Sequence, residues 1–354
     1  MKKNINLNTK RGEKEKISLL TYMKFGLFLC LIFLLSSSAL VSAWSNGGYS
    51  EDPSHPDYGT HDWIAQHALD WLPTEEKQYL LDSLATYLYG TELPDNGQAP
   101  DGIGDTSKHH VYFSSSGTLV DDSAAIRANA TWTQALNYLL ASNLTMAAKY
   151  AGIMSHYLAD MAVFGHVMGD GTDWGTETHH SDYENYVNTR TSSYNAEFNV
   201  FLSFDGNLSL ISAYNATILL AYDTTFDNGS LTCVWMDQNY DWDNSTFQNR
   251  AGASLNLAVN YVTDVLHTLY SACHGTVNDT TPPVANAGQS KEVAVGSAVT
   301  FDAGGSTDDI GITSYVWTFT DGTAKTLTGV TANYTFTNLG TYIITLNVTD
   351  TAGN

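Results

Sequence analysis

The chain has 354 residues, of which 43% are apolar, so it is long enough to bury two cores and is not a disordered chain. It carries 15 basic and 37 acidic side chains, a formal net charge of −22 at pH 7. Such an acidic surface repels polyanions at long range. Nucleic acid is therefore not an expected partner.

The N-terminus is typical of an export signal. A basic run precedes the apolar stretch "FGLFLCLIFLL", and "SSSALVSA" follows with a small-x-small pattern that ends at Ala43. We predict a signal peptide over residues 1–43, with Met23 as an alternative start. The eleven apolar residues are short for a membrane-spanning helix, so an uncleaved anchor is the weaker interpretation. Cleavage removes 7 of the 15 basic and 2 of the 37 acidic residues, which leaves 8 and 35 and a formal charge of −27.

Export predicts a protein that is secreted or held at the cell surface. Cys233 and Cys273 would remain after cleavage, either paired or free. Asn-x-Ser/Thr sequons recur between Asn129 and Asn347, which fits a glycoprotein.

The pattern from Thr60 to about Cys273 is helical. Apolar residues recur three and four apart in segments such as "HDWIAQHALDWL", "SAAIRANATWTQALNYLLAS" and "RAGASLNLAVNYVTDVLHTLYSA". We predict an all-α domain over residues 44–274. The prolines and glycine of "NDTTPPVANAGQS" then predict a linker at 275–284.

Residues 285–354 alternate with period two and are punctuated by Gly, Asp and Asn, which predicts the short strands of an all-β sandwich. The segments "VWTFTDG" and "YTFTNLGTYIITLNVTDTAGN" resemble the polycystic-kidney-disease (PKD) domain, an immunoglobulin-like module. The resemblance implies a spacer or adhesive module that contacts a cell-surface protein or glycan.

Histidines and carboxylates gather in "SHYLADMAVFGHVMGDGTDWGTETHHSDYENYV". His156 and Asp160 are four residues apart on a predicted helix, so they share one face. His166 lies six residues further on and off that face, so the helix should break near Gly165.

His180 and Glu184 repeat the four-residue spacing on the next predicted helix, after the Gly- and Asp-rich loop "VMGDGTDWGTETH". Two antiparallel helices would point these five groups at a shared centre. Imidazole and carboxylate ligands at such spacings suit zinc.

The steps of 4, 6, 14 and 4 residues from His156 to Glu184 resemble those of the bacterial zinc-dependent phospholipases C, which include alpha-toxin-like enzymes. "HYLADMAVFGH" and "HSDYENYV" are similar in their flanking residues too. Related single-strand nucleases have a longer loop before the last histidine and end with Asp. The spacing and Glu184 therefore favour the phospholipase branch.

The same resemblance implies further ligands. The family's mature N-terminal tryptophan, whose amine and carbonyl bind metal, corresponds to Trp44, and its first histidine ligand to His61 in "GTH". Its Pro-Asp motif and the histidine that follows correspond to Asp101 and His110.

The last two assignments leave alternatives open. The interval from Asp101 to His110 is shorter than in characterised family members, so Asp105 or Asp95 competes with Asp101. His109 competes with His110 in the same way.

The resemblance implies up to three zinc ions. One would be held by Asp101, His110, His156 and Asp160. A second would be held by His166, His180 and Glu184. The third would be held by Trp44, His61 and a bridging Asp160. Asp101 is also the candidate general base.

The resulting interpretation is a secreted zinc-dependent phosphodiesterase of phospholipase C type. It would cleave phospholipid, or another phosphodiester, into diacylglycerol or a related alcohol and a phosphorylated head group, with peripheral membrane contact. The positions that form a choline-binding cage in a choline-preferring family member correspond to Gly47, Gly102 and Ser107. The cage is therefore not visible in this sequence, and the head group is not predicted. The alternatives are a nuclease or other phosphoesterase of the superfamily, and a surface adhesion protein with a purely structural metal site.

Overall fold

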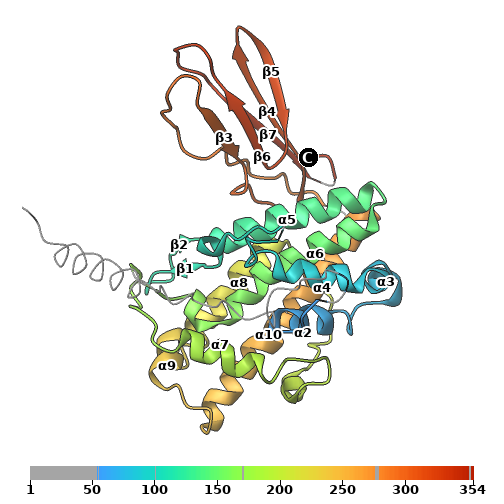
Figure 1. Cartoon of the computed structure of the whole chain (residues 1–354), viewed down its shortest axis with the longest axis vertical. Coiled ribbons are helices and arrows are strands. Elements are labelled where there is room, and N and C mark those ends of the chain that lie inside the picture. Colours follow the sequence, from blue (N-terminus) through green and yellow to red (C-terminus); the bar gives the residue numbers. More distant parts are fainter. Residues whose placement is uncertain (1–53, 55, 100, 170, 276–278, 351) are drawn as a thin grey trace, which may run out of the picture. The chain divides into compact units, whose positions relative to one another are not determined.

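The computed structural model describes most of the chain after residue 53, with short gaps. The described residues are 54, 56–99, 101–169, 171–275, 279–350 and 352–354. The predicted signal peptide and Trp44 lie outside them. The described chain is mainly helical up to Cys273 and forms β-strands from Ala298 on, so the predicted order of a helical part followed by a β part is confirmed (Figure 1).

The first part consists of α-helices, short 3-10 turns and one small hairpin. The α-helices are α2 (Thr60–Ala68), α3 (Thr74–Asp82), α4 (Leu84–Glu92), α5 (Ser123–Leu140), α6 (Leu144–Ala159), α7 (His180–Asn188), α8 (Ala213–Phe226), α9 (Cys233–Gln238) and α10 (Ser245–Cys273). The 3-10 turns are η1 (Thr106–Lys108), η2 (Asp160–Ala162), η3 (Phe164–His166) and η4 (Glu197–Phe201), and the hairpin pairs β1 (Tyr112–Phe113) with β2 (Leu119–Asp121).

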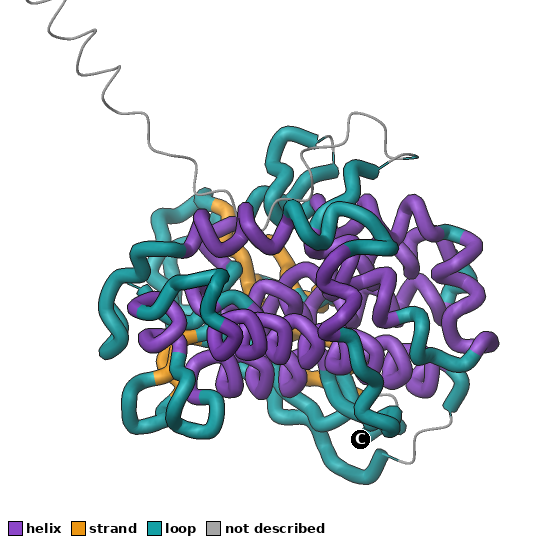
Figure 2. Tube along the Cα trace, turned by 90° about the horizontal axis from the view of Figure 1, so that it is seen from below, coloured by secondary structure: helices purple, strands orange, loops and turns teal. Residues whose placement is uncertain are grey.

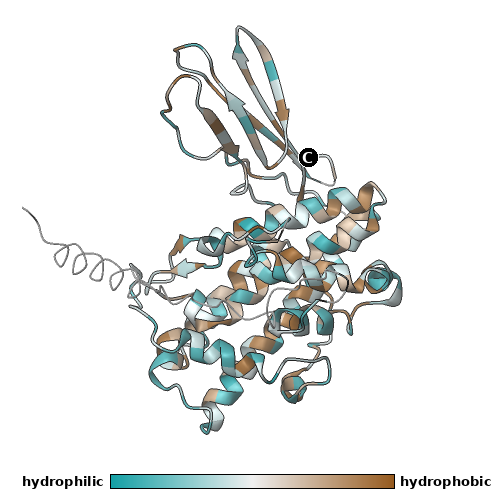
Figure 3. Cartoon of the chain, viewed as in Figure 1, coloured by the Kyte–Doolittle hydropathy of each residue, from teal (hydrophilic) through white to brown (hydrophobic). Residues whose placement is uncertain are grey.

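The helices begin where the sequence supplies caps and they bury their apolar faces. Asn143 caps α6 by accepting a hydrogen bond from the Met146 N–H, and Asn244 caps α10 by accepting one from Thr246. Polar and apolar residues alternate around the helical ribbons in Figure 3, as amphipathic helices require. In Figure 2 the helical segments lie against one another with loops around them.

Helices α4 and α6 approach unusually closely, and this contact positions the site described below. A Cβ atom added to Gly152 of α6 would lie 1.9 Å from the carbonyl oxygen of Tyr87 in α4. A Cβ added to Gly90 would lie 2.2 Å from the carbonyl oxygen of Lys149. Only glycine permits this backbone contact, which brings the end of α4 against the middle of α6.

The β part forms two antiparallel sheets around a core that includes the fully buried Trp317. One sheet pairs β3 (Ala298–Asp302) with β6 (Thr331–Thr335). The other has the order β5 (Thr323–Thr328), β4 (Ile312–Asp321), β7 (Thr345–Asp350). Buried and exposed residues alternate along β3, as the period-two pattern predicts.

Two further sequence expectations bear on the described residues. Cys233 is buried, Cys273 is half-buried, and both are free thiols, so the pairing considered for them is absent. Of the helices that the structure describes, none combines the length and apolar character needed to cross a bilayer.

Asp264 on α10 gives a test of how pH affects stability. It is buried, its Oδ1 accepts a hydrogen bond of 2.9 Å from the Ser209 N–H, and burial raises its pKa to about 6. Because this pKa is higher than that of an unfolded aspartate, the folded state binds the proton more tightly, and stability falls as pH rises from about 4 to 6. Above pH 6 the folded protein bears the full cost of burying the ionised Asp264 carboxylate.

We therefore expect Asp264→Asn to raise the Tm at pH 8 by about 2–4 °C, equivalent to about 1 kcal/mol in a domain of this size. The gain should disappear at about pH 3, where Asp264 is mostly protonated in both states. Thermal unfolding followed by circular dichroism would measure this, with the exposed Asp243→Asn as control. A gain of equal size at both pH values would contradict the titration.

Candidate metal centre

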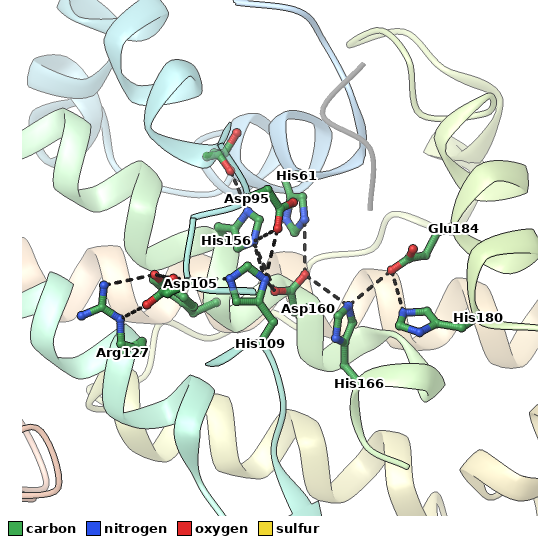
Figure 4. Close-up of polar contacts among 12 residues, drawn as sticks. His61, Asp95, Asp105, His109, Arg127, His156, Asp160, His166, His180 and Glu184 are labelled. Atoms are coloured by element: carbon green, nitrogen blue, oxygen red, sulfur yellow. Dashed lines mark hydrogen bonds and ion pairs between the residues drawn. The ribbon is translucent and has the colours of Figure 1, made fainter. Parts of the chain in front are cut away.

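Side chains from five segments converge on one buried cluster in the helical part (Figure 4). They come from α2, the segment after α4, the segment after η1, the end of α6 with the turns that follow it, and α7. The members are His61, Asp95, His109, His156, Asp160, His166, His180 and Glu184.

His156 and Asp160 lie one turn apart at the end of α6, as predicted from their spacing. His156 Nε2 lies 3.3 Å from Asp160 Oδ2. The other ring nitrogen, Nδ1, donates a 2.6 Å hydrogen bond to the carbonyl oxygen of Thr91 at the end of α4. Burial lowers the pKa of His156, so the ring is neutral and its Nε2 lone pair points at the cluster.

The chain turns sharply after α6, which brings His166 to the same centre. Helix α6 ends at Ala159, and the extended Val163 separates the turns η2 and η3. His166, at the end of η3, places Nε2 3.3 Å from Glu184 Oε1 and 3.7 Å from Asp160 Oδ1. The break predicted near Gly165 is therefore present, two residues earlier.

Helix α7 supplies the last two groups. His180 Nε2 lies 2.9 Å from Glu184 Oε1, one turn further along the helix. A Cβ atom on Gly165 would lie 2.4 Å from Cγ of His180, so the glycine makes room for this ring. Burial alone would lower the pKa of His180, but hydrogen bonds to Glu177 and Glu184 raise it to about 10.

Asp95 and His109 complete the cluster, in place of Asp101 and His110. Asp95 follows α4, and His109 follows η1. The Nδ1 atom of His109 lies 3.3 Å from Asp95 Oδ1 and 3.1 Å from Asp160 Oδ2. From the sequence, both residues are only competing assignments.

A pinched loop explains the difference. The N–H groups of Ile103 and Asp105 donate to the carbonyl oxygens of Leu93 and Pro94. These bonds close a loop on which Gly97, Gln98 and Asp101 are exposed. Asp101, on this loop, has a 45% exposed side chain that pairs with Lys149. It does not reach the cluster.

His110 points away from the cluster as well. Its Nε2 lies 3.4 Å from Asp121 Oδ1, and its ring stacks on Tyr112. Both Asp95 and Asp101 follow a proline, so the Pro-Asp motif could not separate them. The short interval from Asp101 to the histidine is the signal in the sequence that could have pointed to the earlier Asp95.

His61 lies in the first turn of α2, as the resemblance implied. Its Nε2 is 3.3 Å from Asp160 Oδ1, and its ring stacks on His156 with centroids 3.9 Å apart. Asp62, the next residue, accepts hydrogen bonds from the Gly59 N–H and the Thr91 hydroxyl. It therefore ties α2 to the same end of α4 that orients His156.

A second layer that sequence reasoning missed supports His109. Asp105 Oδ1 lies 3.6 Å from His109 Nε2, on the side of the ring away from the cluster. Asp105 is in turn held by Arg127 Nε at 2.7 Å and by the Tyr157 hydroxyl at 2.7 Å. Asp105, considered above as a ligand, thus orients a histidine, a common arrangement around metals. Arg127 and Tyr157 lie 22 and 52 residues further along the chain, so no local motif connects them.

The charges of the cluster are those that a cation would balance. Burial would raise the pKa of Asp160, yet the neighbouring imidazoles, His156 and His166 foremost, hold it well below its usual range. Burial would lower the pKa of His109, but Asp105 and Asp160 raise it to about 10. Buried carboxylates are costly unless positive charge lies close to them.

The residues also fit a metal geometrically. In the part of the chain that the structure describes, both Asp160 oxygens and His166 Nε2 are buried without a normal hydrogen bond. Ligand atoms lie within 4.8 Å of one another in three groups. These are His61–Asp95–His156, His109–His156–Asp160 and His166–His180–Glu184. Imidazole nitrogens with carboxylate oxygens are the donor set of zinc.

Comparison with solved structures finds clostridial toxins. "Alpha Toxin from Clostridium Absonum" is 15% identical with a TM-score of 0.46, and the match covers 85% of this chain and 89% of the toxin. Alpha-toxin from an avian strain of Clostridium perfringens is 14% identical with a TM-score of 0.40, and covers 79% and 82%. No curated protein sequence matches the chain significantly.

Two family models match the chain. The model described as "Zinc dependent phospholipase C" matches residues 60–219, and the model described as "PKD domain" matches residues 280–354. Both are the families that the sequence motifs resemble, so that prediction is confirmed. Residues 60–219 thus match the zinc-dependent phospholipase C family, and residues 280–354 match the PKD domain.

Proposed function

We propose that this chain is an exported zinc-dependent hydrolase of phospholipase C type that cleaves phosphodiesters, with phospholipid as the expected substrate. The observation that carries the proposal is the adjacency of three groups of zinc-ligand atoms around Asp160. A single structural zinc needs four ligands, and eight converging side chains exceed that need. The match of residues 60–219 to the phospholipase C family supports the same reaction.

We assign the ligands to up to three zinc ions, as the family resemblance implies. His166, His180 and Glu184 would hold one. Asp95, His109, His156 and Asp160 would hold another. His61, a bridging Asp160 and the amine and carbonyl of Trp44 would hold the third, if cleavage after Ala43 makes Trp44 the N-terminus. This assignment replaces Asp101 and His110 by Asp95 and His109.

Bound zinc ions supply two kinds of chemistry, because they acidify coordinated water and neutralise charge on phosphoryl oxygens. The chain's own residues set the conditions for it. The hydrogen bond from His156 Nδ1 to Thr91 fixes which ring nitrogen faces the centre. Asp105 places a carboxylate oxygen 3.6 Å from Nε2 of His109, on the opposite side of that ring.

Asp95 also takes over the general-base role first given to Asp101. Its carboxylate lies among His109 and His156, whereas Asp101 pairs with Lys149 on an exposed loop. A base has to lie within hydrogen-bond reach of the proton that it accepts. Among the two candidates, only Asp95 is beside the proposed ligands.

The first test is metal content and activity with a defined N-terminus. We expect close to three zinc ions, measured by mass spectrometry of the metal, and hydrolysis of a p-nitrophenylphosphoryl ester by protein that begins at Trp44. One extra residue before Trp44 should remove a zinc ion and most of the activity. Full activity in the extended protein would refute the role of the Trp44 amine. Fewer than two zinc ions and no hydrolysis in either form would leave the structural, adhesive alternative.

Paired variants test the corrected ligands. Asp95→Asn and His109→Ala should lower zinc content and reduce kcat/KM by more than the roughly 10- to 100-fold typical of outer residues around a metal. Their matched controls, Asp101→Asn and His110→Ala, should stay within about 2-fold of the parent, because exposed contacts such as Asp101–Lys149 contribute little. Large losses in the Asp101 and His110 variants, with little change in the Asp95 and His109 variants, would show that Asp101 and His110 are the ligands.

Asp105 is tested as a positioning residue. Asp105→Asn should weaken zinc affinity by about 10- to 100-fold, because the amide no longer carries the charge that orients His109. Competition with a zinc chelator would measure the affinity, and added zinc should rescue the activity. The control is Asp121→Asn, which removes the equivalent partner of His110. An unchanged affinity together with a lower Tm would show that Asp105 only stabilises the fold.

A further inference from the structure

Three buried aspartates meet in the β part of the chain, and none of them is among the residues assigned to zinc; Asp279 directly precedes the segment that matches the PKD domain, and the other two lie within it. Asp279 lies at the start of the described β part, Asp308 in the loop before β4, and Asp350 at the end of β7. They are 8%, 8% and 2% exposed. One oxygen of each lies within 4.8 Å of the others.

Backbone N–H groups hold each carboxylate in place. Thr281 donates to Asp279 Oδ1 at 2.9 Å, and Ile310 donates to Asp308 Oδ2 at 3.0 Å. Asp350 Oδ1 accepts from the N–H groups of residues 352, 353 and 354 at 2.7–2.9 Å. The three side chains are therefore fixed by the loops that carry them.

Two carboxylate oxygens of this cluster lack a hydrogen-bond partner in the described part of the chain. Asp279 Oδ2 and Asp308 Oδ1 are buried and have no hydrogen-bond partner among the residues that the structure describes. A buried, unsatisfied carboxylate oxygen is costly, so two of them in one cluster require an explanation. Both belong to side chains that are more than nine-tenths buried.

Among the described residues, no positive charge lies beside this cluster. Residues 279–354 contain two lysines, Lys291 and Lys325, and no arginine or histidine. Within the described chain, no basic side chain forms an ion pair with any of the three aspartates. Burial, and then neighbouring carboxylates, raise the pKa of Asp279 and of Asp308.

We propose that Asp279, Asp308 and Asp350 bind a calcium ion within the PKD domain. All the ligands are oxygens, which hard cations prefer, and no nitrogen or sulfur is present to favour zinc. Calcium lies about 2.3–2.6 Å from each ligand oxygen, so two oxygens on one ion are at most about 5 Å apart. The spacing of the three carboxylates satisfies this limit. Magnesium demands a smaller, near-ideal octahedron and keeps more of its water.

The ion would join three segments that are distant in sequence. Asp279 comes directly after the segment that follows α10, whereas Asp350 closes the last strand. Calcium would therefore fix the entry of the chain into the domain to its final strand. Because three buried carboxylates repel one another without it, the domain should be markedly less stable in calcium-free buffer.

The experiment uses zinc-loaded protein in buffer cleared of calcium. Calcium chloride, up to about 10 mM, is titrated by calorimetry, since affinities of extracellular calcium modules reach about 10⁻⁴–10⁻³ M. We expect one saturable event in the parent and at least about 10-fold weaker binding in Asp308→Asn, as calcium affinity depends on the number of charged ligands. Asp279→Asn provides a second variant. Asp302→Asn, an exposed aspartate on β3, is the control and should bind like the parent.

Thermal unfolding distinguishes a binding site from a merely structural cluster. Without calcium, Asp308→Asn should unfold at a higher temperature than the parent, because it removes one of three repelling charges and its amide oxygen still accepts from Ile310. With saturating calcium the order should reverse. Absence of saturable binding in the folded parent would overturn the proposal, as would parent-like binding in both variants. An equal response to magnesium chloride would overturn the choice of calcium.

Discussion

The helical part depends on one buried carboxylate, that of Asp160. Its Oδ1 faces His61 and His166, and its Oδ2 faces His109 and His156, at 3.1–3.7 Å. A charge without solvent must be balanced by neighbours, and here the neighbours come from four separate segments. The position of Asp160 therefore determines where α2, α6, the segment after η1 and η3 must meet.

Glycines in the backbone allow these segments to approach one another closely. Gly90 and Gly152 let α4 and α6 touch, which places the Thr91 carbonyl against His156. Gly165 leaves room for the ring of His180. Without a Cβ these residues cost folding entropy, but they allow approaches that no other residue permits. The close packing of these helices and the arrangement of the clustered histidines therefore depend on the same glycines.

The two parts of the chain handle buried acid differently. Around Asp160 and Glu184 the partners are imidazoles, which bind a borderline metal such as zinc through nitrogen. In the PKD part, backbone N–H groups hold the carboxylates of Asp279, Asp308 and Asp350, the side-chain amide of Asn354 also donates to Asp350, and no imidazole lies beside them among the described residues. The same rule, that buried charge requires a counter-charge, hence leads to a nitrogen-rich centre in one part and an all-oxygen cluster in the other.

The sequence by itself determined the order of an α part and a β part, the resemblance to two families, and the proximity of the candidate ligands from His156 to Glu184. Those features are local: helical periodicity, strand alternation, and spacings of four residues that survive folding because a helix turn is rigid. Only the tertiary structure decided between Asp95 and Asp101 and between His109 and His110. The physical reason is that the hydrogen bonds of Ile103 and Asp105 to the end of α4 close a loop, which turns one Pro-Asp inward and carries the other out to Lys149. Neither the support of His109 by Asp105 and Arg127 nor the meeting of Asp279 with Asp350 leaves a local signal, because these contacts join residues far apart in the chain.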